Sequence, residues 1–121
     1  MKNDEILKKI KRYNWYHEIE LKDGIKTSAV DAFEVDGKYK TYSSTNDHWN
    51  QKNVFRILKD IDFKNKRVLD IGCRDGLFSF YAEKKGAAEI IGIDNDLSKG
   101  AVEFLIPYFN SKVKMHQKKS L

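Results

Sequence analysis

The stretch from Arg67 to Asp96 constrains the fold more than any other part of the chain. It begins with a short apolar run, continues through a glycine-containing loop, and reaches a second apolar run that ends in Asp94. Both runs have the composition of parallel strands covered on both faces. Their apolar residues are Val68, Leu69 and Ile71 in the first run and Ile90, Ile91 and Ile93 in the second. Between them, apolar side chains at helical spacing predict a helix that stops near Gly86. This order predicts an α/β fold.

The loop after the first strand has the form D-x-G-x-x-x-G, from Asp70 to Gly76. Glycines at its two ends let the backbone turn sharply and let a ligand approach closely. Open α/β sheets bind ligands at the carboxyl ends of their strands, where Asp94 is also expected. The dinucleotide fingerprint G-x-G-x-x-G is missing, because Arg74 and Asp75 occupy the middle of the loop and disfavour an anionic pyrophosphate. A nicotinamide dinucleotide is therefore the less favoured ligand.

An acid before the first glycine and another at the end of the next strand resemble the first two motifs of the class I S-adenosylmethionine-dependent methyltransferases. The resemblance implies a methyltransferase whose cofactor is S-adenosyl-L-methionine. It implies that Asp70 supports the methionine end, although this acid can also bond loop amides, and that Asp94 binds the ribose hydroxyls. A sulfonium cation suits a carboxylate-lined crevice. The other residues expected around the cofactor are Gly72, Cys73, Arg74 with its side chain outward, Asp75, Gly76 and Asn95.

A narrower resemblance lies upstream of this unit. Residues 15–27, WYHEIELKDGIKT, are similar to the W-[YF]-H-x-I-x-L-x-D-G-x-x-T lead-in of a methyltransferase group that includes tRNA wobble-uridine methyl- and carboxymethyltransferases. Residues 75–80, DGLFSF, are similar to the same group's version of the loop. The resemblance implies a tRNA uridine as methyl acceptor. A sugar or another small metabolite stays open as the alternative.

Several side chains allow two interpretations. His17 could act as a general base near neutral pH, or it could orient its neighbours through a hydrogen bond. Trp15, Tyr16 and Trp49 could stack on a base or on adenine, or they could anchor the N-terminal segment. Cys73 is expected to fill space under the loop, because methyl transfer needs no covalent step. The histidines and acids show no metal-ligand spacing, so no metal is expected.

The flanking segments predict further helices and short strands. Residues 4–13 carry an apolar stripe typical of an amphipathic helix, and residues 17–21 and 33–42 alternate like strands with turns at Asp23-Gly24 and Asp36-Gly37. N-cap residues at 43–47 precede a predicted helix that reaches residue 61. Ser98 should cap a helix that Pro107 ends or kinks. Residues 112–117 alternate like an edge strand.

Together these elements predict a three-layer Rossmann-like α/β fold with a partial parallel sheet of strand order 3-2-1. Residues 1–46 are expected to form an N-terminal extension, a helix plus hairpin-like strands acting as a lid or packing segment. Residues 47–121 are expected to form the N-terminal half of a methyltransferase domain, ending after its third strand and not catalytic alone. The outer edge of the first strand is then unpaired, which predicts a homodimer through that edge unless residues 15–42 cover it.

Composition indicates the class of protein and the cellular compartment to expect. With 40% hydrophobic and 34% charged residues, the sequence is typical of a soluble globular domain. It contains no bilayer-spanning apolar run and no signal-peptide pattern, and its single cysteine permits no internal disulfide, so a cytoplasmic location is expected. The net charge of +5 could attract RNA phosphates, although solvated surface lysines are the commoner explanation.

Overall fold

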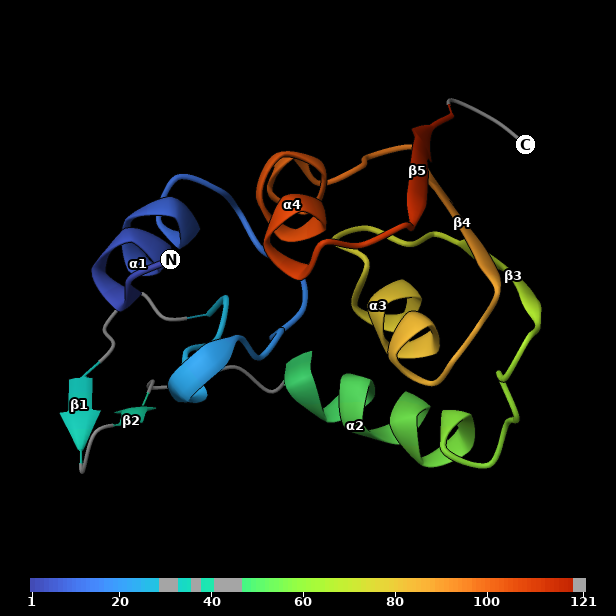
Figure 1. The fold of residues 1–121 in the computed structure, drawn as a ribbon, viewed down its shortest axis with the longest axis horizontal. Helices are drawn as coiled ribbons and strands as arrows, with labels where there is room; N and C mark the ends of the chain where they lie inside the picture. Colours follow the sequence, from blue (N-terminus) through green and yellow to red (C-terminus); the bar gives the residue numbers. More distant parts are fainter. Residues whose placement is uncertain (29–32, 36–37, 41–46, 119–121) are drawn as a thin grey trace.

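The computed structural model describes residues 1–28, 33–35, 38–40 and 47–118 (Figure 1). Its elements follow one another along the chain as α1 (Asn3–Ile10), η1 (Lys22–Gly24), β1 (Phe33–Val35), β2 (Lys38–Lys40), α2 (Asp47–Leu58), β3 (Arg67–Ile71), α3 (Leu77–Lys84), β4 (Glu89–Asp94), η2 (Ala101–Leu105), α4 (Ile106–Phe109) and β5 (Lys114–Gln117). None of the helices in these ranges combines the length and apolar character needed to cross a bilayer.

Three parallel strands form the main sheet, in the order β3-β4-β5. The first predicted strand therefore lies at one edge, the second in the middle and the third at the other edge, which confirms the predicted order. In the register, Ile71 lies opposite Ile93, and Asp94 lies opposite Gln117. The carboxyl ends of the three strands consequently share one end of the sheet.

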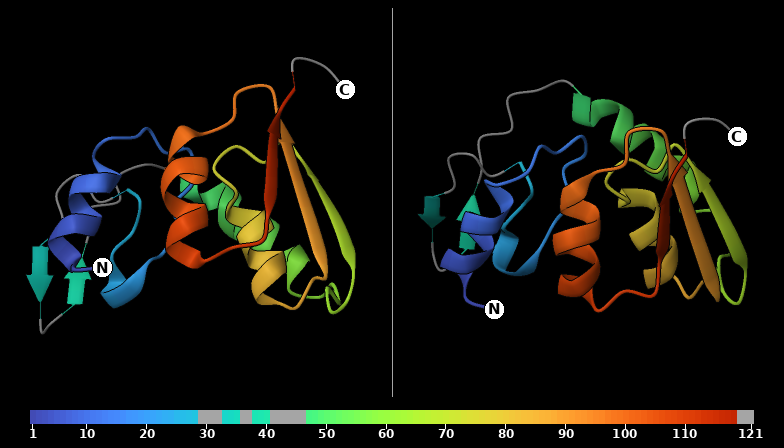
Figure 2. Two further views of the ribbon diagram at one scale, coloured as in Figure 1. Left: turned by 45° about the horizontal axis from the view of Figure 1, so that its top comes forward. Right: turned by 90° about the horizontal axis from the view of Figure 1, so that it is seen from above.

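Only one face of this sheet is covered in the described part of the chain. Figure 2 shows α3 and α4 on the same side of the strands. Ile90, which points to that side, is buried, whereas Leu69 and Ile71 on the other face are 60% and 61% exposed. The prediction of strands buried on both faces is thus wrong for β3, and the described residues form two layers rather than three. Side chains alternate across a strand, so an apolar run alone does not say which face is covered.

The helix after β3 agrees with its prediction. Helix α3 begins after Gly76 and ends at Lys84. Gly86 has φ of 96°, and the amide of Ala87 donates to the carbonyl of Ala82 at 3.1 Å. A left-handed residue after a helix lets the next amides satisfy the last carbonyls, which confirms Gly86 as the stop.

The N-terminal segment contains the predicted helix but only a trace of the predicted strand. Helix α1 has acids in its first turn and lysines in its last, as the helix dipole favours. At residues 17–21, Ile19 and Leu21 are buried and alternate with exposed Glu20. Among the described residues, however, this stretch forms a single isolated bridge, from Glu20 to Lys26. The chain reverses too quickly for a longer ladder, because η1 follows at once and the amide of Leu21 donates to the carbonyl of Ile25 at 2.6 Å.

The hairpin predicted at residues 33–42 is present as β1 paired antiparallel with β2. The turn at Asp36-Gly37 and the N-cap residues 43–46 lie outside the described residues, as does the side chain of Trp49. Helix α2 ends at Leu58, earlier than predicted, and exposed Ile61 follows it in a turn.

The helix after β4 continues past Pro107, where the sequence predicted an end or a kink. Ser98 caps it as expected, since its hydroxyl accepts from the amide of Ala101 at 3.2 Å. The chain forms the π-helix η2 and then continues as α4, with Pro107 in the first turn of α4 and Asn110 (φ 50°) at the end. Proline lacks an amide donor and clashes with the carbonyl four residues back. The wider π turn before Pro107 accommodates both effects, so the proline marks a change of helix type rather than an end.

One hydrophobic cluster joins the N-terminal segment to the helices on the covered face of the sheet. Its buried members include Ile6, Ile10, Ile19, Leu21, Ile25, Leu77, Phe80, Phe104 and Leu105. In Figure 1 the described part of residues 15–42 lies on this helical side, far from β3. The described residues therefore leave the outer edge of β3 uncovered, contrary to the alternative in which this segment folds over it.

Candidate functional site

The glycine loop, residues 70–76, connects β3 to α3 at the carboxyl end of the sheet. Gly72 and Gly76 have φ of 74° and 83°, which glycine adopts without strain. The amide of Gly72 donates to the carbonyl of Ile93 at 2.8 Å and ties the loop to β4. A Cβ on Gly72 would meet no atom within 4 Å, whereas one on Gly76 would lie 2.3 Å from Met115 Cε. Gly72 therefore borders open space, and Gly76 is a packing position.

Cys73 lies under this loop and is almost completely buried. Its sulfur occupies the space beside Gly92, where an added Cβ would lie 2.9 Å from Sγ. Burial is the largest cause that raises the pKa of the thiol to about 12, so the sulfur stays protonated near neutral pH. The side chain thus has the packing role expected from the sequence.

Two carboxylates flank the open space at the ends of neighbouring strands. Asp70 accepts a hydrogen bond from Ser79 Oγ at 2.6 Å. Burial raises the pKa of Asp70, although Ser79 and His17 oppose the shift, and the nearby carboxylate of Asp94 adds to it. Asp94 is 8% exposed and accepts from the amides of Arg74 and Asp96, both at 2.8 Å. Each carboxylate oxygen has two acceptor sites, so Asp94 can still accept a hydroxyl. We call this arrangement of Asp70, Gly72 and Asp94 the carboxylate crevice.

Asp75 points away from that crevice, toward the N-terminal segment. Its side chain is fully buried, and Oδ2 accepts from the amides of Tyr16 and His17 at 2.9 and 2.7 Å. Its Oδ1 forms a short contact with His17 Nδ1. The imidazole also packs edge-on against Phe78, with 5.2 Å between ring centres. The geometry supports the orienting interpretation of His17, while its action as a general base stays a prediction.

Arg74 joins the loop to two other segments. Its backbone has φ of 49°, and its guanidinium pairs with Asp96 at 2.5 Å. The guanidinium carbon also lies 5.0 Å from the ring centre of Tyr16, which is 63% exposed. The side chain points outward, as expected, and forms part of a wall rather than lying free in solvent.

Trp15 anchors the N-terminal segment. Its indole Nε1 donates to the carbonyl of Ile10 at 2.9 Å. A Cβ on Gly100 would lie 2.5 Å from the Trp15 ring, so the indole packs directly on the backbone there. For Trp15 the anchoring interpretation is therefore confirmed. Sequence reasoning missed Gly100, although a glycine two residues after a helix-capping serine, where no turn needs one, indicates close packing.

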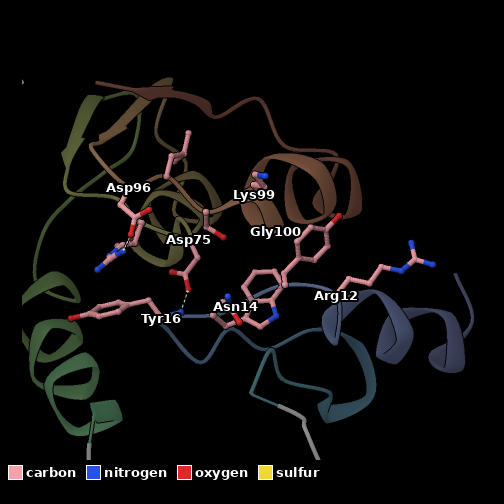
Figure 3. Close-up of a pocket in the computed structure, with 12 residues that line it drawn as sticks. Arg12, Asn14, Tyr16, Asp75, Asp96, Lys99 and Gly100 are labelled. Atoms are coloured by element: carbon pink, nitrogen blue, oxygen red, sulfur yellow. Dashed lines mark hydrogen bonds and ion pairs between the residues drawn. The ribbon is translucent and has the colours of Figure 1, made fainter. Parts of the chain in front are cut away.

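A cavity of about 550 Å³ lies beside the glycine loop (Figure 3). Residues 12–16 form one side, residues 96–100 form the other, and Arg74 and Asp75 complete it. We call it the lead-in cavity. Asp70, Gly72 and Asp94 are not among the residues that line it, so the carboxylate crevice and the lead-in cavity lie on different parts of the same loop. Asn95, expected at the cofactor, is exposed beside them, and its carbonyl accepts from Gln117 Nε2 at 2.9 Å. Within the described ranges, no group of three His, Cys, Asp or Glu side chains could hold a metal ion.

No protein-family model matches the chain. In sequence it is similar to protein arginine N-methyltransferase 1 of Saccharomyces cerevisiae, with 31% identity over 87 residues that cover 60% of this chain and 25% of that protein. It is also similar to ribosomal protein L11 methyltransferase of Helicobacter pylori, with 35% identity over 49 residues that cover 40% of this chain and 15% of the relative. The chain thus spans a quarter or less of the length of these curated relatives.

Two solved structures overlap the chain in part. One is a proposed S-adenosylmethionine dependent methyltransferase from Listeria monocytogenes, with 34% sequence identity and a TM-score of 0.44. The matched region covers 56% of this chain and 32% of the Listeria chain. The other is a proposed RNA methyltransferase from Pyrococcus horikoshii, with 28% sequence identity and a TM-score of 0.42. The matched region covers 61% of this chain and 37% of the Pyrococcus chain. The curated relatives named above are methyltransferases. Methyltransferases are also the enzyme class that the motifs of the chain resemble.

Proposed function

We propose that this chain forms the S-adenosylmethionine-binding part of a methyltransferase. The observation that carries the proposal is the carboxylate crevice, in which two acids at the ends of adjacent parallel strands flank the open space at Gly72. A cofactor with a positive sulfonium and a ribose diol needs a carboxylate near the cation and an acceptor for the hydroxyls. The sequence similarity to methyltransferases supports the same ligand.

Within the proposal each residue has a distinct role. Asp94 accepts the ribose hydroxyls through the acceptor sites that the amides of Arg74 and Asp96 leave free. Asp70 faces the positive methionine end, and a cation there offsets the unfavourable burial of its charge. The backbone of Gly72 lets the cofactor lie against the loop. The sulfonium would supply its methyl group to an O, N or C nucleophile, whose lone pair bonds the methyl carbon as the carbon–sulfur pair returns to sulfur.

Alignment is the main requirement of such a displacement, and in favourable systems it contributes up to about 7–11 kcal/mol. The lead-in resemblance supports a tRNA uridine as acceptor, with a small metabolite as the alternative. A second candidate function is a cofactor-binding module that does not turn over alone. The uncovered face of β3, with Leu69 and Ile71 exposed, favours this candidate, because a substrate pocket needs walls that the described residues do not provide.

Calorimetry with S-adenosylmethionine and its demethylated product tests the proposal. Asp94→Ala should weaken binding by about 1.5–3 kcal/mol, the range for a hydrogen bond to a charged group. Asp94→Asn keeps an acceptor for only one of the amides of Arg74 and Asp96, which bind different oxygens of Asp94, so it should weaken binding less than Asp94→Ala. Asp60→Ala, which removes an exposed acid after α2, is the matched control and should bind normally. Tight binding of NAD together with no binding of the sulfonium cofactor would contradict the proposal.

A further inference from the structure

We propose that His17 sets the preference of the carboxylate crevice for the cationic cofactor over its uncharged demethylated product. When the imidazole is neutral, the negative charge of Asp70 is available to the sulfonium. When the imidazole carries a proton, it is itself a cation beside the same acid. The charge of His17 would then decide which form of the cofactor binds better. The inference rests on the proposed function and adds proton-linked selection at the same site.

Asp75 holds the imidazole in one orientation. Its carboxylate is fully buried, and Oδ2 accepts from the amides of Tyr16 and His17 while Oδ1 contacts His17 Nδ1. An ionised carboxylate only accepts hydrogen bonds, so Nδ1 is the nitrogen that carries the proton of the neutral ring. Nε2 is therefore the nitrogen that gains or loses a proton when His17 changes its charge.

Asp70 is the second acid beside this imidazole. The ring of His17 packs edge-on against Phe78, and the next residue of α3, Ser79, donates to Asp70 at 2.6 Å. The first turn of one helix thus contacts both side chains. Burial raises the pKa of Asp70, whereas Ser79 and the electrostatic attraction of His17 lower it. The charge of His17 therefore acts on the acid that the proposed function places at the sulfonium.

The other charged groups near the imidazole already have partners. Arg74 of the loop pairs with Asp96 and lies over the ring of Tyr16, which packs edge-on against the imidazole with 4.8 Å between ring centres. Glu18, the next residue of the segment, pairs with Lys26 at 3.0 Å. The contact from α3 is an aromatic ring without charge. Within the described ranges, these groups leave the two loop acids as the charges that a proton on the imidazole compensates.

A proton on the ring changes what the crevice favours. Charged His17 offsets part of the negative charge of Asp70 and Asp75, so a second cation gains less by binding there. The demethylated product has no sulfonium charge and does not lose this attraction. The preference for the cofactor over the product should therefore rise with pH through the titration of the imidazole, which ordinarily occurs near about pH 6.5.

Calorimetry of both ligands with the whole chain, at about pH 5.5 and about pH 8, tests the inference. In the wild type, the ratio of cofactor affinity to product affinity should be at least about threefold lower at the lower pH. His17→Gln keeps an amide donor for Asp75 but cannot gain a proton, so its ratio should stay high at both pH values. His116→Gln, at an exposed position on β5, is the matched control and should behave like the wild type. A fall of the same size in His17→Gln would assign the effect to Asp70 and overturn the inference.

Nuclear magnetic resonance of the imidazole C–H signals tests the same point without any substitution. Because linkage between a proton and a ligand is reciprocal, bound cofactor should move the midpoint of the His17 titration to lower pH, and bound product should not. His116 provides the internal reference. Equal midpoints with the two ligands would overturn the inference. If neither ligand binds, the proposed function fails and this inference with it, whereas binding of both with a pH-independent ratio contradicts this inference alone.

Discussion

Asp70 and Asp94 occupy equivalent ends of neighbouring strands, yet their surroundings differ. Both oxygens of Asp94 accept hydrogen bonds from backbone amides. Asp70 has the hydroxyl of Ser79, and burial raises its pKa. In the absence of a cation, burial makes the charge of Asp70 unfavourable, and a cationic ligand would relieve this cost.

The burial of Asp70 predicts that removing its charge stabilises the fold but weakens cofactor binding. Because its pKa in the folded chain lies above its ordinary value of 3.8, the folded state holds the proton more tightly. The contribution of Asp70 to the free energy of unfolding is therefore most favourable at pH values below 3.8, and it is lost as pH rises through the raised pKa. Asp70→Asn should thus raise the melting temperature by a few degrees at pH 7 and change it little at low pH, while weakening sulfonium binding. Thermal unfolding at both pH values measures this, and lower stability at pH 7 would contradict it.

At the scale of elements, the lead-in segment and the glycine loop behave as one unit because Asp75 binds both. His17 lies 58 positions from Asp75 in the sequence, and its amide donates directly to the Asp75 carboxylate rather than to a strand of the sheet. The indole of Trp15 then brings the same segment against the backbone at Gly100. Movement of the lead-in would therefore move the loop.

Asp75→Ala should separate the two elements. It leaves the amides of Tyr16 and His17 without their acceptor, which costs about 1–3 kcal/mol for a buried donor. Urea unfolding should show this loss, and amide exchange at both positions should accelerate. Asp75→Asn retains one acceptor oxygen and should lose less. Unchanged exchange at Tyr16 and His17 in the alanine variant would show that other contacts hold the segment.

Gly100→Ala tests the other attachment of the lead-in. The added methyl would lie 2.5 Å from the Trp15 ring, so the indole must shift, and overpacking of this kind costs about 1–3 kcal/mol. Because alanine favours helix at this position, a variant as stable as wild type or more stable would show that the ring moves freely. The double variant Trp15→Leu/Gly100→Ala should lose less than the sum of the single changes.

At the scale of the whole molecule, the main sheet presents an open edge and an open face. Among the described strands, β3 pairs only with β4, and Leu69 and Ile71 are exposed beside its free edge. Free strand edges with apolar neighbours pair readily with another chain. The homodimer predicted from the sequence remains a proposal, now with these two side chains as its apolar contacts.

Light scattering at micromolar concentrations tests that dimer. Leu69→Lys should place a charge in the proposed contact and weaken association at least about tenfold. Val102→Lys, at an exposed apolar position on η2 away from the sheet, is the control and should associate like wild type. A chain that stays monomeric in all three forms would rule the dimer out.

Local features of the sequence were enough for the strand–loop–helix–strand unit. The apolar runs, the loop glycines and Gly86 each act within a few residues, and the structure confirms the elements that they predict. Ser98 as a helix cap belongs to the same class. Such predictions succeed because hydrogen bonds and φ preferences of neighbouring residues decide them, whatever lies elsewhere in the chain.

Only the tertiary structure decided which residues share a site and which face of the sheet is covered. The sequence did not indicate the partners of Asp75, whose buried carboxylate needs hydrogen-bond donors, and the fold provides them from Tyr16 and His17. An apolar strand likewise predicts burial on both faces, but Leu69 and Ile71 are exposed because no described helix packs on their side. Periodicity records which side chains point the same way, and packing between distant segments determines what they meet.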